Sequence, residues 1–130
     1  DFTFIATANA VAYTGAKPVF ADILKDSLTI DPENIKKLIT KNTKAIIPVH
    51  IYGHPAEMDQ INQIAKDNNL FVLEDAAEAH GQQQMGQLCG SFGDISTFSF
   101  YANKHVTTGE GGLVVTDSTE TYKKLLEKIK

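Results

Sequence analysis

The chain has 130 residues, enough for one domain around a single hydrophobic core. Its 42% hydrophobic and 22% charged residues are typical of a folded globular domain and exclude a disordered, collagenous or coiled-coil protein. The formal net charge of −4 argues against nucleic acid or an anionic membrane as a partner, and no apolar run approaches the length of a membrane span.

The first residues and the single cysteine give further limits. Residues 1–10 lack the basic stretch and uninterrupted apolar run of a secretory signal, so we expect a cytoplasmic location. Cys89 alone cannot form a disulfide within the chain or build a thiolate metal cluster. We therefore expect Cys89 to be a small, partly buried apolar residue.

Short apolar runs alternate with amphipathic segments, which predicts α/β architecture with a largely parallel sheet. An opening helix over residues 6–13 should end at Gly15. A second helix should begin after Asp31, an N-cap residue followed by Pro32 at the first helical position. The apolar runs suit strands covered on both faces, and we expect these at residues 18–23, 45–49, 70–73, 95–100 and 113–116.

Apolar residues at helical spacing define three stripes. The helix after Asp31 has one formed by Ile35, Leu38 and Ile39. A helix over residues 57–67, stopped by Asn68-Asn69, has one formed by Met58, Ile61, Ile64 and Ala65. A last helix starting near Ser118 has one formed by Tyr122, Leu125, Leu126 and Ile129. No repeat or linker interrupts this order, so we expect a single domain.

The predicted strand at residues 70–73 runs directly into Glu74-Asp75. Parallel sheets place ligands outside the carboxyl ends of their strands, so these carboxylates are candidate site residues. A carboxylate there would be partly buried and would have to be paired, ligated or protonated. The alternative is that both residues only cap the following alanine-rich turn.

A lysine follows the aromatic strand at residues 95–100, in a loop rich in hydroxyls and glycines. Such surroundings can desolvate the amine of Lys104 and prepare it as a nucleophile, although most lysines are simply solvated. Gly109, Gly111 and Gly112 do not form a dinucleotide-binding fingerprint. We expect these glycines to allow a tight backbone path.

Four histidines invite a metal hypothesis. His50 and His54 are four residues apart, but Gly53 and Pro55 break any helix across them, and no glutamate follows His50 to complete an H-E-x-x-H motif. We therefore expect no metal site. His80 and His105 lie near the candidate site in sequence, and we expect them to provide supporting hydrogen bonds.

Six segments together resemble the DegT/DnrJ/StrS family of nucleotide-sugar aminotransferases, which are pyridoxal-phosphate (PLP) enzymes. They are residues 2–9 (FTFIATAN), 15–22 (GAKPVFAD), 48–59 (PVHIYGHPAEMD), 74–81 (EDAAEAHG), 91–94 (SFGD) and 97–112 (TFSFYANKHVTTGEGG). The match covers essentially the whole chain in the family's order. It implies a three-layer α/β/α fold with a mainly parallel sheet, the aspartate-aminotransferase fold or PLP fold type I.

The family pattern implies roles for five residues. Lys104 matches the lysine that bonds covalently to the cofactor and afterwards moves the proton between substrate and cofactor. Asp75 matches the carboxylate that faces the pyridine nitrogen and keeps it protonated. Ser99 matches a hydroxyl that binds the cofactor phosphate, and Glu78 occupies a position near the phenolic oxygen. Phe4 matches an aromatic ring stacked on the pyridine, with core packing as its alternative.

The resemblance implies that the chain is the central part of the PLP-binding large domain. The family's N-terminal phosphate-binding segment and its C-terminal small domain would lie outside residues 1–130. The family also shares its sites across a homodimer. We therefore expect the 130 residues alone to be inactive.

The implied reaction transfers an amino group, with glutamate as donor, to a keto carbon of a nucleotide-linked deoxysugar. The segment TTGEGG (107–112) resembles members that aminate C4, and Glu78 with His80 resembles the perosamine synthases among them. Two alternatives stay open. A sugar dehydratase of the same family would carry histidine in place of Lys104, and His105 is adjacent. A regulatory relative or small ligand-binding module would keep the scaffold without catalysis.

Overall fold

The computed structural model describes residues 2–129, with side chains to residue 128, and centres on a four-stranded sheet. The strands lie in the order β1 (Ala45–Ile46), β2 (Phe71–Asp75), β5 (Ile95–Ser99) and β6 (Gly112–Val115). β1, β2 and β5 are parallel, whereas β6 pairs antiparallel with β5. A small hairpin of β3 (Gln83–Gln84) and β4 (Gln87–Leu88) stands apart from this sheet. The predicted mainly parallel α/β fold is confirmed.

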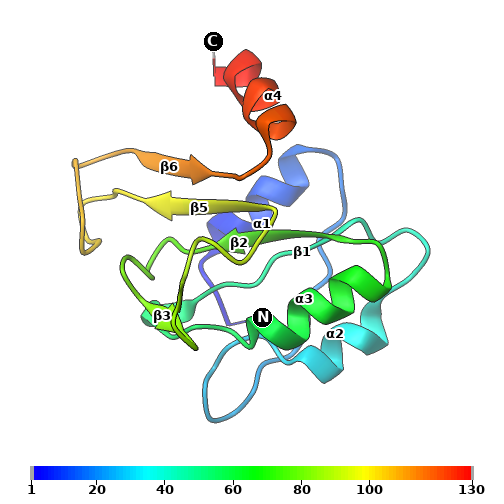
Figure 1. Cartoon of the computed structure of the whole chain (residues 1–130). Helices are drawn as coiled ribbons and strands as arrows, with labels where there is room; N and C mark the ends of the chain where they lie inside the picture. Colours follow the sequence, from blue (N-terminus) through cyan, green and yellow to red (C-terminus); the bar gives the residue numbers. More distant parts are fainter. Residues whose placement is uncertain (1, 130) are drawn as a thin grey trace.

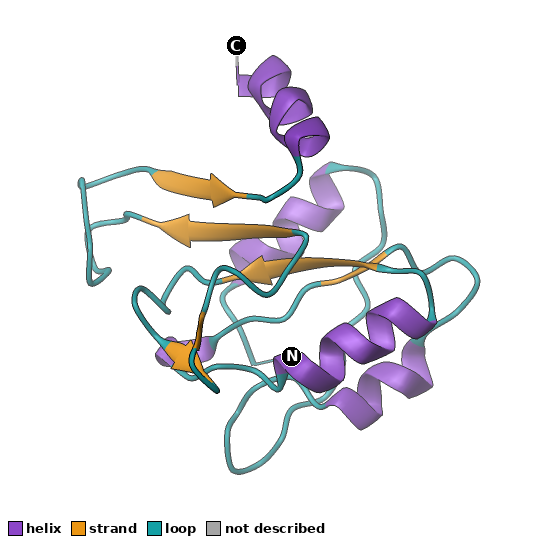
Figure 2. Ribbon diagram, viewed as in Figure 1, coloured by secondary structure: helices purple, strands orange, loops and turns teal. Residues whose placement is uncertain are grey.

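Helices lie on both sides of the sheet (Figure 1). In this view α1 (Ile5–Tyr13) lies behind the strands, and α2 (Pro32–Leu38) and α3 (Met58–Asp67) lie in front of them. The 3₁₀ turn η1 (Ile51–Gly53) follows β1, and α4 (Thr119–Ile129) extends beyond β6. Figure 2 shows the same succession of helix, strand and loop. None of the described helices combines the length and apolar character needed to cross a bilayer.

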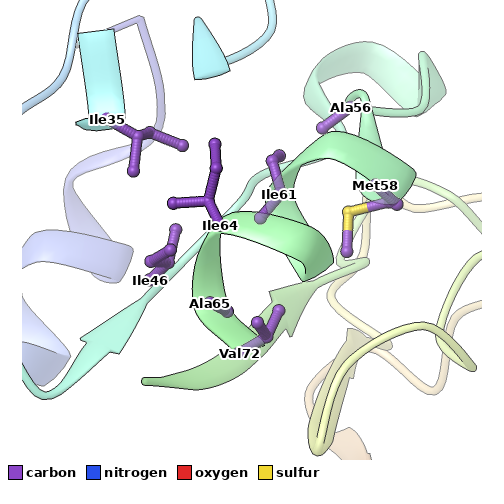
Figure 3. Packing of buried hydrophobic residues seen from close by; sticks show 8 residues of the cluster. All are labelled: Ile35, Ile46, Ala56, Met58, Ile61, Ile64, Ala65 and Val72. Carbon is purple, nitrogen blue, oxygen red and sulfur yellow. The ribbon is translucent and has the colours of Figure 1, made fainter. Parts of the chain in front are cut away.

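The main core lies between α3, α2 and the first two strands. All four residues of the predicted α3 stripe are buried, and Figure 3 shows them beside Ile46 of β1 and Val72 of β2. Ile35 joins them from α2. Burying each isoleucine, valine or methionine side chain contributes roughly 1.5–3 kcal/mol to the stability of the fold. This cluster therefore holds α3 against the strand that carries Glu74 and Asp75.

The ends of the helices follow the predicted signals. Asp31 caps α2 by accepting the Glu33 N–H at 2.9 Å. α1 ends one residue before the Thr14 cap, and Gly15 follows with a left-handed φ of 80°. Ser118 accepts the Thr121 N–H at the start of α4. The predicted place of Ile129 on the α4 stripe lies outside the described side chains.

We expect Asp31→Ala to lower the free energy of unfolding by about 1 kcal/mol, because the α2 N-terminus loses its side-chain acceptor. Denaturant unfolding followed by circular dichroism measures this loss. Asp31→Asn is the matched control, since its amide oxygen can still accept the Glu33 N–H. An equal loss in both variants would show that the cap bond is unimportant.

One strand prediction is wrong. Residues 18–23 form no strand; only Ile23 pairs, in an isolated antiparallel bridge with Ile30. An apolar groove of about 630 Å³ is lined by residues of this segment and by residues 44–47. A strand needs a neighbouring backbone to satisfy its N–H and C=O groups, and residues 18–22 pair with none of the described strands. The apolar side chains of Pro18, Val19 and Phe20 line the groove instead.

Candidate active site at the carboxyl ends of β2 and β5

The side chains of the last two residues of β2 lie on opposite faces of the sheet. Successive strand side chains point to opposite faces, so Glu74 and Asp75 diverge. The Glu74 side chain is fully buried, whereas Asp75 is only partly buried. The capping alternative therefore fails for Glu74. It holds in part for Asp75, whose Oδ1 accepts the Ala77 N–H at 3.2 Å.

Asp75 is held toward α1. Its Oδ2 accepts the hydroxyl of Thr7 at 2.7 Å, although the two residues are 68 positions apart. Thr7 lies in the first turns of α1, directly after the loop that carries Phe4. A carboxylate has about four acceptor positions, so these two donors leave capacity for a ligand N–H.

Lys104, in the loop after β5, forms an ion pair with Glu78, which follows Asp75 by three residues. Lys104 Nζ lies 3.0 Å from Glu78 Oε1, with 16% of the lysine side chain and 29% of the glutamate side chain exposed. The second oxygen of Glu78 accepts the Tyr52 N–H at 2.8 Å. Burial alone would raise the pKa of Glu78, but these hydrogen bonds and the nearby positive charges of Lys104 and His105 lower it. These contacts therefore favour the carboxylate form of Glu78, which accepts a hydrogen bond from the Lys104 amine.

The Tyr52 amide reaches Glu78 because η1 has an unusual backbone. Tyr52 has a φ of 52°, a conformation that non-glycine residues rarely adopt. A Cβ on the following Gly53, whose φ is 80°, would lie 3.0 Å from the Glu78 carbonyl oxygen. Strain of this kind persists where the surrounding structure fixes it, and it often marks a functional site.

The loop that carries Lys104 is built from a turn and two left-handed glycines. The Lys104 N–H donates to the Tyr101 carbonyl at 3.0 Å. Gly109 and Gly111 have φ values of 84° and 127°, so the predicted tight backbone path is confirmed at these positions. His105 is exposed, whereas Lys104 turns inward to Glu78. The alternative that His105 takes the lysine's place is thus disfavoured by side-chain direction.

Ser99 and Phe4 complete the predicted set. Ser99 ends β5, two residues beyond Thr97, which pairs with Asp75 across the sheet. Its Oγ accepts the Tyr101 N–H at 3.2 Å, which leaves its own O–H available as a donor. Phe4 is the N-cap residue of α1 and is 76% exposed. Phe4 is therefore not part of the core formed by the described residues.

His80 does not make the hydrogen bonds predicted for it. Its ring nitrogens are buried and have no partner among residues 2–129. The ring lies against Phe98 and Phe100, with centroid distances of 5.3 and 6.0 Å. Instead of polar partners, Phe98 of β5 and Phe100, just after it, present their rings here. His80 is thus packed into an aromatic cluster.

Glu74 is the centre of a buried hydrogen-bond cluster that the sequence did not reveal. Its carboxylate accepts the Phe92 N–H at 3.0 Å, the Gly93 N–H at 3.1 Å and the Ser96 hydroxyl at 2.9 Å, and also the Gly90 N–H. His50 Nε2 lies 2.7 Å from Oε1, the oxygen that also accepts the Gly90 N–H. Burial would raise the pKa of Glu74, but these bonds outweigh it and lower the pKa to about 2.

His50, Glu74 and Cys89 lie close enough together to resemble a metal site. His50 Nδ1 accepts the Ala56 N–H at 3.0 Å, so Nε2 carries the ring proton and donates it to Glu74. Neither nitrogen then offers a lone pair to a cation. Burial and the charge of Glu74 raise the pKa of the Cys89 thiol to about 11, which keeps it protonated. Cys89 is a buried apolar residue, as predicted.

Two residues that hold the site side chains were not predicted from the sequence. Thr7 and Tyr52 hold Asp75 and Glu78, but a threonine in a helix and a tyrosine before glycine carry no specific signal. Only the segments that contain them, residues 2–9 and 48–59, pointed to this region.

Comparison with known proteins identifies the family. Residues 1–128 match the DegT/DnrJ/EryC1/StrS aminotransferase family. The chain is 52% identical over 124 residues to the GDP-perosamine synthase of Escherichia coli O157:H7, an alignment that covers 95% of this chain and 34% of that protein.

Solved structures agree with the sequence match. DesI, solved in the presence of its TDP-sugar product, superposes with a TM-score of 0.92 at 40% identity and covers 95% of this chain and 32% of its own. NtdA of Bacillus subtilis, solved with bound cofactor PMP, superposes with a TM-score of 0.90 at 39% identity. The alignment covers 96% of this chain and 28% of the NtdA chain. The chain spans about a third of the length of the curated relatives it matches. With these matches and this fold, the chain belongs to the DegT/DnrJ/EryC1/StrS aminotransferase family.

Proposed function

We propose that the chain is the central part of the cofactor-binding large domain of a PLP-dependent aminotransferase that acts on a nucleotide-linked sugar. The observation that carries this proposal is the contact of Lys104 with Glu78 at 3.0 Å, which joins the loop after β5 to the segment that follows Asp75 at the end of β2. The choice of pyridoxal phosphate as cofactor follows from membership of this aminotransferase family, in which a related structure holds PMP. The names of two relatives, a GDP-perosamine synthase and a protein solved with a TDP-sugar product, support the substrate class.

The described residues fit pyridoxal phosphate by their donor set. Lys104 supplies an amine for the aldehyde carbon, and Asp75 supplies an anion for a protonated ring nitrogen. Ser99 retains a free O–H for the phosphate. The exposed ring of Phe4 is open to stacking on a flat heterocycle. These groups come from the start of α1, the carboxyl ends of β2 and β5, and the loop after β5; Thr7 links α1 to Asp75, and Asp75 pairs with Thr97 of β5.

Bound pyridoxal phosphate supplies an electron-withdrawing ring that stabilises negative charge at the carbon losing its proton. The chain's own residues would do the rest. Asp75, oriented by Thr7 and Ala77, would face the ring nitrogen and favour its protonated form. Lys104 Nζ would take the proton from the substrate carbon and return it to the cofactor carbon, and Glu78 would orient Nζ by accepting its hydrogen bond.

The finer features of the proposal rest on the resemblance. The segment 107–112 favours amination at C4, and glutamate is the donor to test first. A homodimer that shares its sites and a cytoplasmic location also remain predictions. The 130 residues as such are expected to lack activity, since the proposal places the small domain and phosphate-binding segment outside them.

The test uses the full-length enzyme mixed with pyridoxal phosphate and then reduced with borohydride. We expect a long-wavelength absorbance band before reduction and a pyridoxyl group on Lys104 in the peptide map afterwards. Addition of glutamate before reduction should convert the cofactor to its amine form and prevent labelling of Lys104. A label spread over surface lysines, with none at Lys104, would contradict the proposal.

A further inference from the structure

His50 is bonded to two consecutive residues of β2 at once. Its ring donates to the Glu74 carboxylate at 2.7 Å, and its backbone N–H donates to the Asp75 carbonyl at 3.1 Å. The Asp75 N–H donates in turn to the Pro48 carbonyl at 2.9 Å. The side chain of Glu74 and the backbone of Asp75 are therefore joined through one residue of the neighbouring segment.

This arrangement fixes the position of the strand end. The Glu74 carboxylate is fully buried and is surrounded by five donors from His50, Ser96 and the loop at residues 90–93. A shift of β2 along its axis would pull a buried anion away from these donors, which is costly. Asp75 cannot move relative to the sheet while Glu74 stays in place.

The two donors to the Asp75 side chain set its direction but not its position along the strand. Thr7 and Ala77 set the direction of the carboxylate, but Thr7 comes from α1 and Ala77 from the turn after β2. Neither fixes how far Asp75 projects along the strand axis. That distance depends on the pairing of β2 with β5 on one side, and on the backbone bonds to Pro48 and His50 with the Glu74 cluster on the other.

We propose that His50 is a positioning residue for the Asp75 carboxylate. Its ring holds Glu74 in place, and its backbone amide holds Asp75 at the carboxyl end of β2. This inference rests on the proposed function, in which Asp75 faces the ring nitrogen of the cofactor. His50 itself lies on the opposite, buried side of the strand end and acts only through Glu74 and Asp75.

Two substitutions separate the two hydrogen bonds of the His50 ring. His50→Asn keeps an acceptor where Nδ1 lies and can still bind the Ala56 N–H, but it is too short to reach Glu74. His50→Gln places an amide N–H₂ at the distance of Nε2 and can donate to Glu74, but leaves Ala56 without its acceptor. Both variants are polar and similar in size.

In the full-length enzyme we expect His50→Asn to weaken pyridoxal phosphate binding at least about tenfold and to reduce the visible circular dichroism of the bound cofactor. His50→Gln should stay within about threefold of the wild type in affinity. Ile61→Val in α3 is the structural control, because it lowers stability in the core without touching Glu74. It should leave the circular dichroism of the cofactor unchanged.

A measurement without cofactor keeps the two proposals apart. Hydrogen exchange of the Asp75 amide should accelerate in His50→Asn, relative to that of Ile64, and not in His50→Gln. Wild-type affinity or unchanged exchange in His50→Asn would overturn the positioning role. If the wild-type enzyme acquires no pyridoxyl group at Lys104, the proposed function fails, and the exchange result still decides the role of His50.

Ser96→Ala covers the case in which His50→Asn does not fold. It removes one donor to Glu74, at 2.9 Å, and leaves the ring of His50 in place. A smaller acceleration of exchange at Asp75 is expected. Exchange identical to that of the wild type would count against the Glu74 cluster as the support of Asp75.

Discussion

Lys104→Ala is expected to slow amino-group transfer from glutamate to the bound cofactor at least about a thousandfold. The substitution removes the only amine near Glu78 in the described chain, and with it both the nucleophile and the group that moves the substrate proton. Stopped-flow absorbance of the full-length enzyme after mixing with glutamate measures the rate. Added methylamine should restore part of it, because a free amine can take the proton in place of the side chain.

The control for this prediction is Lys124→Ala. Lys124 lies on α4, is largely exposed and pairs with Glu120 on the same helix, so its loss should change the rate less than about twofold. A Lys104→Ala enzyme that retained a rate within about tenfold of the wild type would remove Lys104 from the proton transfer. The Lys104 site would then be structural, as in a regulatory relative that keeps the scaffold.

The fold was largely predictable because helices and buried strands leave local signals. The stripe of Met58, Ile61, Ile64 and Ala65 is buried in full, and Asp31 with Pro32 marks the start of α2. Strand 18–23 failed for a non-local reason, since an apolar run becomes a strand only where a partner lies beside it. The antiparallel direction of β6 depends on the path of residues 100–111, which composition does not encode.

The sequence predicts a set of site residues but not their geometry. Resemblance selected Asp75, Glu78, Ser99, Lys104 and Phe4, whereas the physical reading alone left Asp75 and Lys104 open. The Lys104–Glu78 contact joins residues 26 positions apart, and the Tyr52 amide reaches Glu78 only through a left-handed backbone. Glu74 was seen as a possible cap because the phase of strand alternation, which buries it, cannot be read from two adjacent acids.

Glu74→Gln is expected to lower the free energy of unfolding at neutral pH by about 3 kcal/mol or more. The pKa of Glu74 is about 2, against an ordinary value of 4.5, and each unit corresponds to about 1.4 kcal/mol. Glutamine also brings its own N–H₂ toward groups that are already donors, namely Ser96 and the amides of residues 90–93. Denaturant unfolding followed by circular dichroism measures the difference. Glu120→Gln, exposed on α4, should change it by less than about 0.5 kcal/mol.

The pH dependence separates the charge of Glu74 from the shape of its side chain. Because the pKa is lower in the folded chain than in the unfolded one, ionised Glu74 stabilises the fold fully above about pH 4.5, and this stabilisation is lost as the pH falls to about 2. The gap between wild type and Glu74→Gln should therefore shrink on acidification across this range and level off below it. A gap that stays constant from about pH 5 to about pH 2 would mean that the cluster needs only the shape of the carboxylate. A shrinking gap would mean that the five donors around Glu74 are matched to an anion. His50 is one of these donors, because its Nδ1 accepts the Ala56 N–H and its Nε2–H faces Glu74.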